Sequence, residues 1–593
     1  MATKKKNELT YMQLPLPQGR RGYTMTKRSW SGLNYRQTID TGALSMENNI
    51  STAEAPYLTP SQEHISVLSR YTNPIIPISM FGFDDFLIVI YRNGTSIYVD
   101  YITYDSDVDK YTAYTGTLQD SGASPDDEYP RCVVQFNKYI ESDDIINGEY
   151  TKRLLIFPDK KSMFFELDDL LNDENNNTDD DFALYSMDVT IKEYYNKTAP
   201  YLPPATANRD YYYKNTYKCD ETLQGTAIYK YCEYETEDEN GNKDGGTEYG
   251  WKISVPPTFP NIKYATVHLS RLFGVSDDSV YASGFNDYAN WNLDSVDTYN
   301  ESNAWCSKAQ SNTKADGNFT GITNFQGHIV CFKRDFMHEI YNTKNPFRIQ
   351  DIYAEGAIDH RTIQDVDGKL IFVSEDGVKI YTGSNPRIIG YYLNMSEYVN
   401  AVSGTDGRCY YLYCEDADGN KRLFVYDTYV EHWSEQNITN TVLSFAHNKH
   451  GMYMLYDDGY IYKMDTGNYR HSWSFETDLI TNETVNIKHI KKIQMFADIP
   501  EKVNGKDNYA EDGKKPAHIQ VYILYDDEVF DDMTSEEKAK RLVYSSTGYG
   551  QKPIRVKPRQ TASYGIKLHI EGYGYVKLYE LELFMENGGD LYA

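Results

Sequence analysis

The hydrophobic and polar positions of the chain fall into short paired runs, and residues 365–386 show the unit most clearly. The pattern predicts a turn at Asp367-Gly368, a strand over 369–374, a tight turn at 375–377 and a second strand over 378–382. Asp-Gly between β-branched and aromatic residues is a strong hairpin signal, because glycine accepts the positive φ of such turns. In the second strand Val378 and Ile380 flank Lys379, which places the lysine on an outward face.

Similar units recur along the chain. Earlier hairpins are predicted over 84–101, with Asn93-Gly94 at the turn, and over 154–167, with Pro158-Asp159 at the turn. Aromatic residues mark the second strand of each unit at Tyr98, Phe165, Tyr281, Tyr341, Tyr381, Tyr426 and Tyr462. A loose period of roughly 40 to 50 residues, rich in glycine and aromatics, is typical of a β-propeller. We therefore expect an all-β fold with a propeller of six to seven blades.

Two regions depart from this rhythm. After Trp473 most predicted strands alternate with period two without forming four-strand units, which indicates a C-terminal β-sandwich with a short helix at 533–542. Residues of about 194–256 read as a loop and hairpin insertion that turns near Gly245-Gly246 and either packs on itself or contacts a partner. The expected domains are an extended arm at 1–36, a propeller at 37–472 and a sandwich at 473–593.

Composition narrows the class of protein. The chain has 593 residues, 25% charged and 40% hydrophobic, which indicates a folded protein. Its 56 tyrosines suit pleated surfaces and interfaces, although genome composition explains them as well. The net charge of −28 argues against DNA binding, yet allows DNA to pass without adsorbing. The seven cysteines form no CxxC pair and are expected to be buried thiols. No signal peptide or membrane-spanning run is predicted.

The first 36 residues are basic in this acidic chain. The arm contains one acid, Glu8, and is either a solvated tail or a segment that orders on an acidic neighbouring subunit. The residues expected to dock on that partner are Lys4, Lys5, Lys6, Arg20, Arg21, Lys27 and Arg28.

The sequence carries no recognisable signature of catalysis, cofactor binding or metal binding. No Gly-rich phosphate loop, H-E-x-x-H or G-x-S-x-G pattern occurs. Residues 374–377 approach the Ser-x-Asp-x-Gly box of sialidases but are one residue short, so a hairpin turn is the simpler interpretation. The pairs His328/His338 and His447/His450 lack a nearby third ligand, and the acidic run 172–181 lacks calcium-loop spacing. We expect no enzyme, no catalytic residue, no cofactor and no metal site.

Several stretches, taken in order, resemble one known family. They are Gly32-Leu33-Asn34 with Gly42 and Asn48-Asn49; 270–274 continuing to 280–284, Asp287 and Trp291; 356–358 and 360–361 with 368–383; and 572–582. Together they resemble the tail nozzle (tail tubular, hub or stabilization) proteins of short-tailed double-stranded DNA bacteriophages, with a Tyr-, Asn- and Asp-rich style similar to that of crAss-like phages. The basic arm and the insertion are departures from the family pattern.

This resemblance implies a podovirus-like structural virion protein, assembled in the host bacterial cytoplasm and located in the tail. It implies a homo-oligomeric ring, a hexamer or a dodecamer, below the portal, in contact with neighbouring tail and portal-adaptor proteins. The ring would extend the channel, retain the genome and permit DNA ejection without specific DNA binding. The alternatives are a carbohydrate-binding or glycan-degrading propeller and a tail-tip receptor adhesin.

Overall fold

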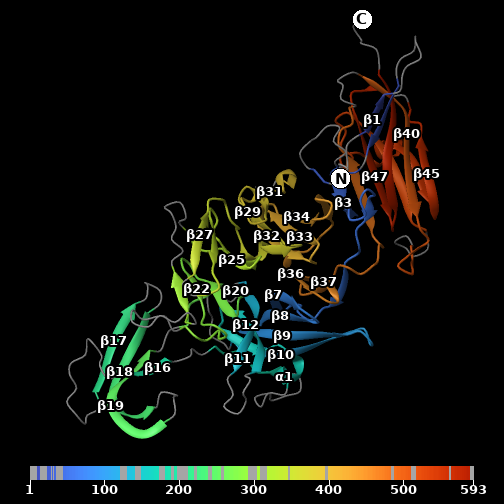
Figure 1. Cartoon of the computed structure of the whole chain (residues 1–593). Coiled ribbons are helices and arrows are strands. Elements are labelled where there is room, and N and C mark those ends of the chain that lie inside the picture. The colour runs from blue at the N-terminus through green and yellow to red at the C-terminus, as the bar shows by residue number, and fades with distance from the viewer. Residues whose placement is uncertain are drawn as a thin grey trace. The chain divides into compact units, whose positions relative to one another are not determined.

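The computed structural model is almost entirely β (Figure 1). It describes residues 10–13, 23–28, 30, 33–34, 44–119, 130–140, 149–171, 181–187, 192–196, 211–218, 224–237, 243–255, 259–291, 303–307, 317–344, 347–393, 398–481, 487–508, 516–559 and 562–587. The described chain divides into two compact units, one of residues 1–87, 103–111 and 364–593 and the other of 88–102 and 112–363.

Seven described sheets have the form of propeller blades. One is five-stranded, in the order β14 (Asp181–Phe182), β10 (Lys110–Gln119), β9 (Ser96–Asp105), β8 (Phe86–Asn93), β7 (Ile75–Phe83). Six are four-stranded and antiparallel. The all-β, propeller-type fold expected from the repeats is therefore confirmed.

The unit of 88–102 and 112–363 holds three four-stranded blades. Their inner strands β11, β20 and β24 follow one another side by side. The bounds are β11 (Cys132–Ile140), β12 (Glu149–Phe157), β13 (Lys161–Phe164) and β15 (Tyr185–Ser186); β20 (Tyr264–His268), β21 (Arg271–Val275), β22 (Val280–Ala282) and β23 (Trp305–Ser307); and β24 (Gly321–Phe325), β25 (His328–Phe332), β26 (Met337–Tyr341) and β27 (Arg348–Ile352). Short helices α1 (Leu167–Leu171) and η1 (His360–Thr362) also lie here.

The insertion in this unit is itself a four-stranded antiparallel sheet. Its order is β16 (Lys192–Asn196), β19 (Lys243–Val255), β18 (Gln224–Glu237), β17 (Tyr211–Lys218). The prediction that its hairpin turns near Gly245-Gly246 is wrong, because both glycines lie inside β19 and the paired strands end at Glu237 and begin at Lys243. Glycine in a strand was mistaken for a turn signal.

The other unit holds three blades followed by the sandwich. The blades are β28 (Gln364–Val366), β29 (Lys369–Ser374), β30 (Gly377–Tyr381) and β31 (Arg387–Ile388); β32 (Tyr398–Thr405), β33 (Cys409–Asp416), β34 (Lys421–Asp427) and β35 (His432–Gln436); and β36 (Val442–Asn448), β37 (Gly451–Tyr456), β38 (Ile461–Lys463) and β6 (Ile65–Leu68). Helix η2 (Tyr391–Leu393) follows β31. The third blade is completed by β6, which comes from the N-terminal end of the chain.

The predicted hairpin of 365–386 is present in this unit. Asp367 and Gly368 both have positive φ, 52° and 68°, and join β28 to β29. The prediction that Lys379 faces outward is wrong: the residue is 6% exposed and its Nζ lies 2.8 Å from Oδ1 of Asp376. A lysine can bury its stem while its ammonium group reaches a carboxylate, so alternation alone did not reveal its face.

The sandwich consists of two sheets. One has the order β1 (Thr10–Gln13), β2 (Tyr23–Arg28), β48 (Lys577–Asn587), β40 (Lys488–Ile499), β45 (Gly550–Val556), with β46 (Ala562–Ser563) beside β40; the other has the order β3 (Leu44–Asn48), β39 (Ser472–Thr477), β47 (Ile566–Tyr573), β43 (His518–Tyr525), β44 (Leu542–Thr547). Apolar side chains of both sheets form one core that includes Leu44, Trp473 and Leu583. N-terminal strands therefore complete a domain formed mainly by the end of the chain (Figure 1).

Three small elements complete this unit. Two short hairpins pair β4 (Ile50–Ser51) with β5 (Thr59–Pro60) and β41 (Lys502–Val503) with β42 (Lys506–Asp507). The helix predicted at 533–542 is α2 (Ser535–Arg541). A capping box fixes its start, because the Thr534 side chain accepts from the Glu537 amide while the Glu537 side chain accepts from the Thr534 amide.

Candidate functional site: the joint segment and its cavity

Residues 44–62, which we call the joint segment, run between the blade of β32–β35 and the sandwich, all within one unit. Asn49 is its most connected residue. Its amide N–H donates to the carbonyl of Glu435 (3.0 Å) in the blade, and its side-chain Nδ2 donates to the carbonyl of Ser472 (2.9 Å) in the sandwich. Its side-chain Oδ1 accepts from the amide of Asn437 (2.7 Å). One asparagine thus links two domains.

The backbone of Asn49 suits this role. Its φ of 56° is left-handed, a conformation that asparagine tolerates better than most residues with a Cβ. Its carbonyl accepts from the amide of Ser61 (2.9 Å), which folds the joint segment back on itself. The paired strands β4 and β5 stabilise the same fold.

Further bonds attach the N-terminal residues to both domains. The amide of Leu33 donates to the carbonyl of Trp433 (3.0 Å) in the blade, and Nε1 of Trp30 donates to the carbonyl of Tyr579 (3.1 Å) in the sandwich. The side chains of Leu44, Ile50 and Leu58 are fully buried in the sandwich core. Apolar burial and directed hydrogen bonds therefore act together at this joint.

Two glutamates of the joint segment lie in contrasting surroundings. Burial raises the pKa of Glu47 well above its usual value, although Oε2 accepts from the amide of Glu435 (3.2 Å). Burial also acts to raise the pKa of Glu54, but hydrogen bonds from Lys577 (2.7 Å) and Tyr575 (2.8 Å) lower it overall. Burial therefore disfavours the charged form of Glu47, whereas the bonds to Lys577 and Tyr575 favour the charged form of Glu54 and tie it to the sandwich.

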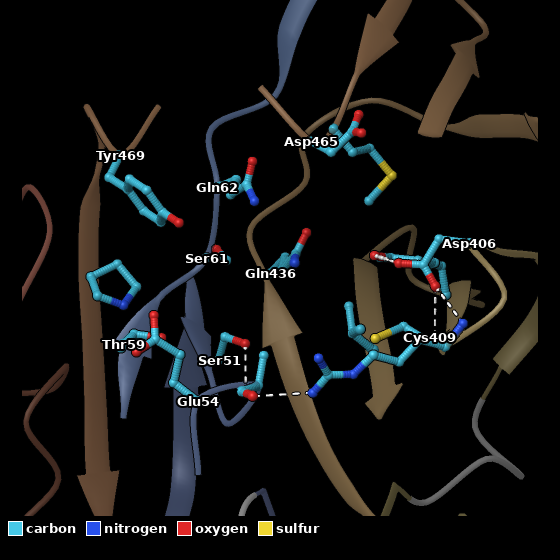
Figure 2. A pocket seen from close by; sticks show the side chains of 16 residues that line it. Ser51, Glu54, Thr59, Ser61, Gln62, Asp406, Cys409, Gln436, Asp465 and Tyr469 are labelled. Atoms are coloured by element: carbon cyan, nitrogen blue, oxygen red, sulfur yellow. Dashed lines mark hydrogen bonds between the residues drawn. The ribbon is translucent and has the colours of Figure 1, made fainter. Parts of the chain in front are cut away.

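A cavity of about 350 Å³ opens beside the joint segment. Ser51 to Gln62 form one wall together with Tyr469, and the β32–β33 turn at Asp406 to Cys409 forms the facing wall (Figure 2). Gln436 lies between the two walls, and Asp465 lies at the end of the sheet of β36–β38. The cavity is lined by residues of one unit.

The charged groups of the facing wall are mostly held by neighbours. Oδ1 of Asp406 accepts from the amides of Arg408 (2.9 Å) and Cys409 (2.7 Å), and its Oδ2 accepts from the hydroxyl of Tyr411 (3.0 Å). Burial, with the charge of Asp406, raises the pKa of Tyr411 well above its usual value. The Arg408 guanidinium donates to Asp427 and to the carbonyl of Ala53 (3.1 Å). The polar side chains of this wall are therefore tied to one another and to the joint segment.

Of the residues that the sequence predicted to dock on a partner, Lys4, Lys5, Lys6, Arg20 and Arg21 lie outside the described part of the chain. Lys27 and Arg28 lie in β2, where their backbones pair with Glu582 and Leu581 of the chain's own sandwich. Docking of the arm on a partner stays a prediction.

The side chains of the other candidate motifs form local hydrogen bonds or ion pairs. Ser374, of the sialidase-like box, donates from Oγ to Asp376 (2.7 Å) and to the carbonyl of Gly377 (2.9 Å), so it closes a hairpin turn. His328 lies 3.2 Å from Glu339, and His338 lies 2.9 Å from Asp351. Among the described residues no group of three or more possible ligands could hold a metal ion. Most of the acidic run 172–181 lies outside those residues.

The five cysteines that the structure describes with their side chains, Cys132, Cys306, Cys331, Cys409 and Cys414, are free thiols, four of them buried. That agrees with the expectation of buried thiols for this part of the chain. No helix among the described residues is long and apolar enough to cross a membrane.

Sequence reasoning missed the cavity. Its residues come from 51–62, 406–411, 425, 436 and 464–469. The Asn48-Asn49 pair of the joint segment was singled out in the sequence, as part of the motifs that resemble the tail family. The remaining residues carry no local signal.

Comparisons with known proteins leave the family open. No protein-family model matches the chain, and no curated protein matches its sequence. Similar solved structures include Kluyveromyces lactis Hsv2 (10% identity, TM-score 0.27, 62% of this chain and 98% of that chain) and Trypanosoma rangeli sialidase with 2,3-difluorosialic acid (8%, 0.26, 91% and 97%). A third is Bacteroides ovatus xyloglucan PUL GH43B (9%, 0.20, 53% and 95%).

At this degree of similarity these structures carry no argument about activity. The expectation that this chain is not an enzyme therefore stays a prediction.

Proposed function

We propose that the protein is a non-catalytic structural subunit of a bacteriophage tail, a nozzle or hub protein that assembles into a ring below the portal. The observation that carries the proposal is the joint at Asn49. The Asn48-Asn49 pair belongs to the ordered motifs that resemble the tail family, and Asn49 holds a blade and the sandwich together through three hydrogen bonds. A ring subunit under internal DNA pressure needs domains that do not hinge.

Other residues of the resemblance have similar roles. Arg271 is 1% exposed, and its Nη1 donates to the carbonyls of Ser283 (2.6 Å) and Asn303 (2.9 Å). The amide of Gly284 donates to the carbonyl of Asn290 (2.7 Å), and a Cβ on Gly284 would lie 2.3 Å from Nδ2 of Asn290. These motif residues hold a blade together, as the motifs of a scaffold would. The net charge of −28 suits a channel that repels the phosphate backbone.

In this proposal the basic arm joins one acidic subunit to the next. The charge reversal Arg20→Glu/Arg21→Glu should leave the melting temperature unchanged and block ring formation, measured by light scattering after size-exclusion chromatography and by negative-stain microscopy. A matched control is Lys557→Glu/Arg559→Glu, two exposed cations near the end of β45. Rings that form equally well in both variants would contradict docking by the arm, and a wild-type protein that never forms rings with its tail partners would contradict the proposal.

The carbohydrate alternative keeps one specific observation in its favour, the polar cavity beside the joint segment.

A further inference from the structure

We propose that the cavity beside the joint segment binds a small neutral ligand rich in hydroxyl groups, such as one or two sugar rings. The proposal deepens the carbohydrate alternative and does not depend on ring assembly. The cavity volume of about 350 Å³ lies at the lower end of the range of small-molecule sites. The ligand is therefore small.

The first argument is an unsatisfied buried hydroxyl. Ser61 is 4% exposed and lines the cavity, and its Oγ has no hydrogen-bond partner in the described part of the protein. A buried polar group without a partner costs free energy, so its partner has to come from the cavity. Its own amide is fixed by Asn49, so the hydroxyl cannot move away with the backbone.

Three other polar groups face the same space. Gln62 is held through Oε1 by the amide of Gly467 (2.6 Å), and Gln436 is held through Oε1 by His64 (2.9 Å). In each case the amide NH2 group is a further hydrogen-bond donor among the groups that line the cavity. Tyr469 adds a hydroxyl and a ring whose edge is packed against Tyr575 at a centroid distance of 4.9 Å. Figure 2 shows Ser61, Gln62, Gln436 and Tyr469 around one space.

The charges around this space select a neutral ligand. Asp406, Asp465 and Glu54 outnumber Arg408 among the lining residues, so an anion would be repelled. The carboxylates are already hydrogen-bonded within the protein, Asp406 and Asp465 to backbone amides and Glu54 to Lys577 and Tyr575. Their pull on a cation is therefore reduced, and the amide donors of both glutamines would face an ammonium group unfavourably. A hydroxyl both donates and accepts, so a polyol matches this mixture of groups.

Saturation-transfer NMR and calorimetry with the full chain test the proposal. The probes are glucose, galactose, N-acetylglucosamine, maltose and cellobiose, with sialic acid and spermidine as charged comparisons. We expect at least one neutral sugar to bind and both charged probes to fail. Ser61→Ala should weaken binding about three- to ten-fold, the loss of one hydrogen bond, and Tyr469→Phe should weaken it similarly.

The matched control is Ser79→Ala, because Ser79 is also a buried serine with an unpartnered Oγ but does not line the cavity. It should bind sugar as the wild type does, and equal melting temperatures would exclude misfolding. Three results would overturn the proposal: silence across the neutral sugars, binding of a charged probe alone, or equal effects of Ser61→Ala and Ser79→Ala. None of these results bears on ring assembly, so failure here and failure of the tail proposal remain distinct.

Discussion

Replacing Asn49 with alanine removes the side-chain bonds of this residue to the blade and the sandwich while leaving its backbone bonds in place. Two side-chain bonds disappear, one to the carbonyl of Ser472 and one from the amide of Asn437. The new residue must also hold a φ of 56°, which disfavours a Cβ. Both effects lower the free energy of unfolding.

The magnitude follows from these two terms. Each side-chain bond is partly exposed and contributes about 0.5–1 kcal/mol, and the left-handed backbone costs about 1 kcal/mol for alanine. We expect Asn49→Ala to lose about 2–3 kcal/mol. Asn49→Gly accepts the same φ and should lose only the two bonds, about 1–2 kcal/mol.

Urea unfolding followed by tryptophan fluorescence reports these losses, since Trp30, Trp433 and Trp473 lie around the joint. The control is Asn504→Ala in the β41–β42 turn, where φ is 50°. Asn504 has no recorded side-chain hydrogen bond among the described residues, so this variant should lose only the backbone term of about 1 kcal/mol. If Asn49→Ala loses no more than Asn504→Ala, the side-chain bonds do not hold the joint.

Three further substitutions test the local structure. Gly377→Val should cost about 1–3 kcal/mol in thermal unfolding, because its φ of 140° disfavours a side chain although a Cβ would make only an ordinary contact with Ile388 (3.6 Å); an unchanged melting temperature would refute this. Gly459→Ala should be worse, because its Cβ would lie 1.9 Å from the carbonyl oxygen of Tyr71; loss of soluble protein is the expected result, and wild-type stability would refute the close approach. Glu47→Gln should stabilise the protein at pH 7. Because the pKa of Glu47 is raised in the folded state, the wild type has its full stability below about pH 4.5 and loses stability as the pH rises toward the folded-state pKa, whereas glutamine does not titrate. A wild-type-minus-variant difference that does not change between pH 4 and pH 8 would contradict this assignment.

The sequence predicted what local pattern determines. The turns at Asn93-Gly94 and Asp367-Gly368 are present because those residue pairs accept positive φ. The helix that follows Thr534 is present because its two capping residues are only three positions apart in the sequence. Alternation failed for Lys379, whose partner Asp376 lies in the turn before it. Local rules describe backbone geometry better than burial.

Pairing between distant segments was beyond these rules. The strand β6 completes the blade of β36–β38, and β2 pairs with β48, although hundreds of residues separate the partners. Ser61 gave no sign in sequence of an unsatisfied hydroxyl, since that property depends on which segments surround it. The joint and the cavity could therefore be found only in three dimensions.

The central claim is that the protein is a structural component of a phage tail. The most direct measurement is immunogold labelling of intact virions from the same source, with an antibody raised against the purified chain and imaged by electron microscopy. The account predicts gold confined to the tail, below the portal, and none on virions labelled with pre-immune serum. Virions that carry no label, and that also lack the chain by mass spectrometry, would contradict it.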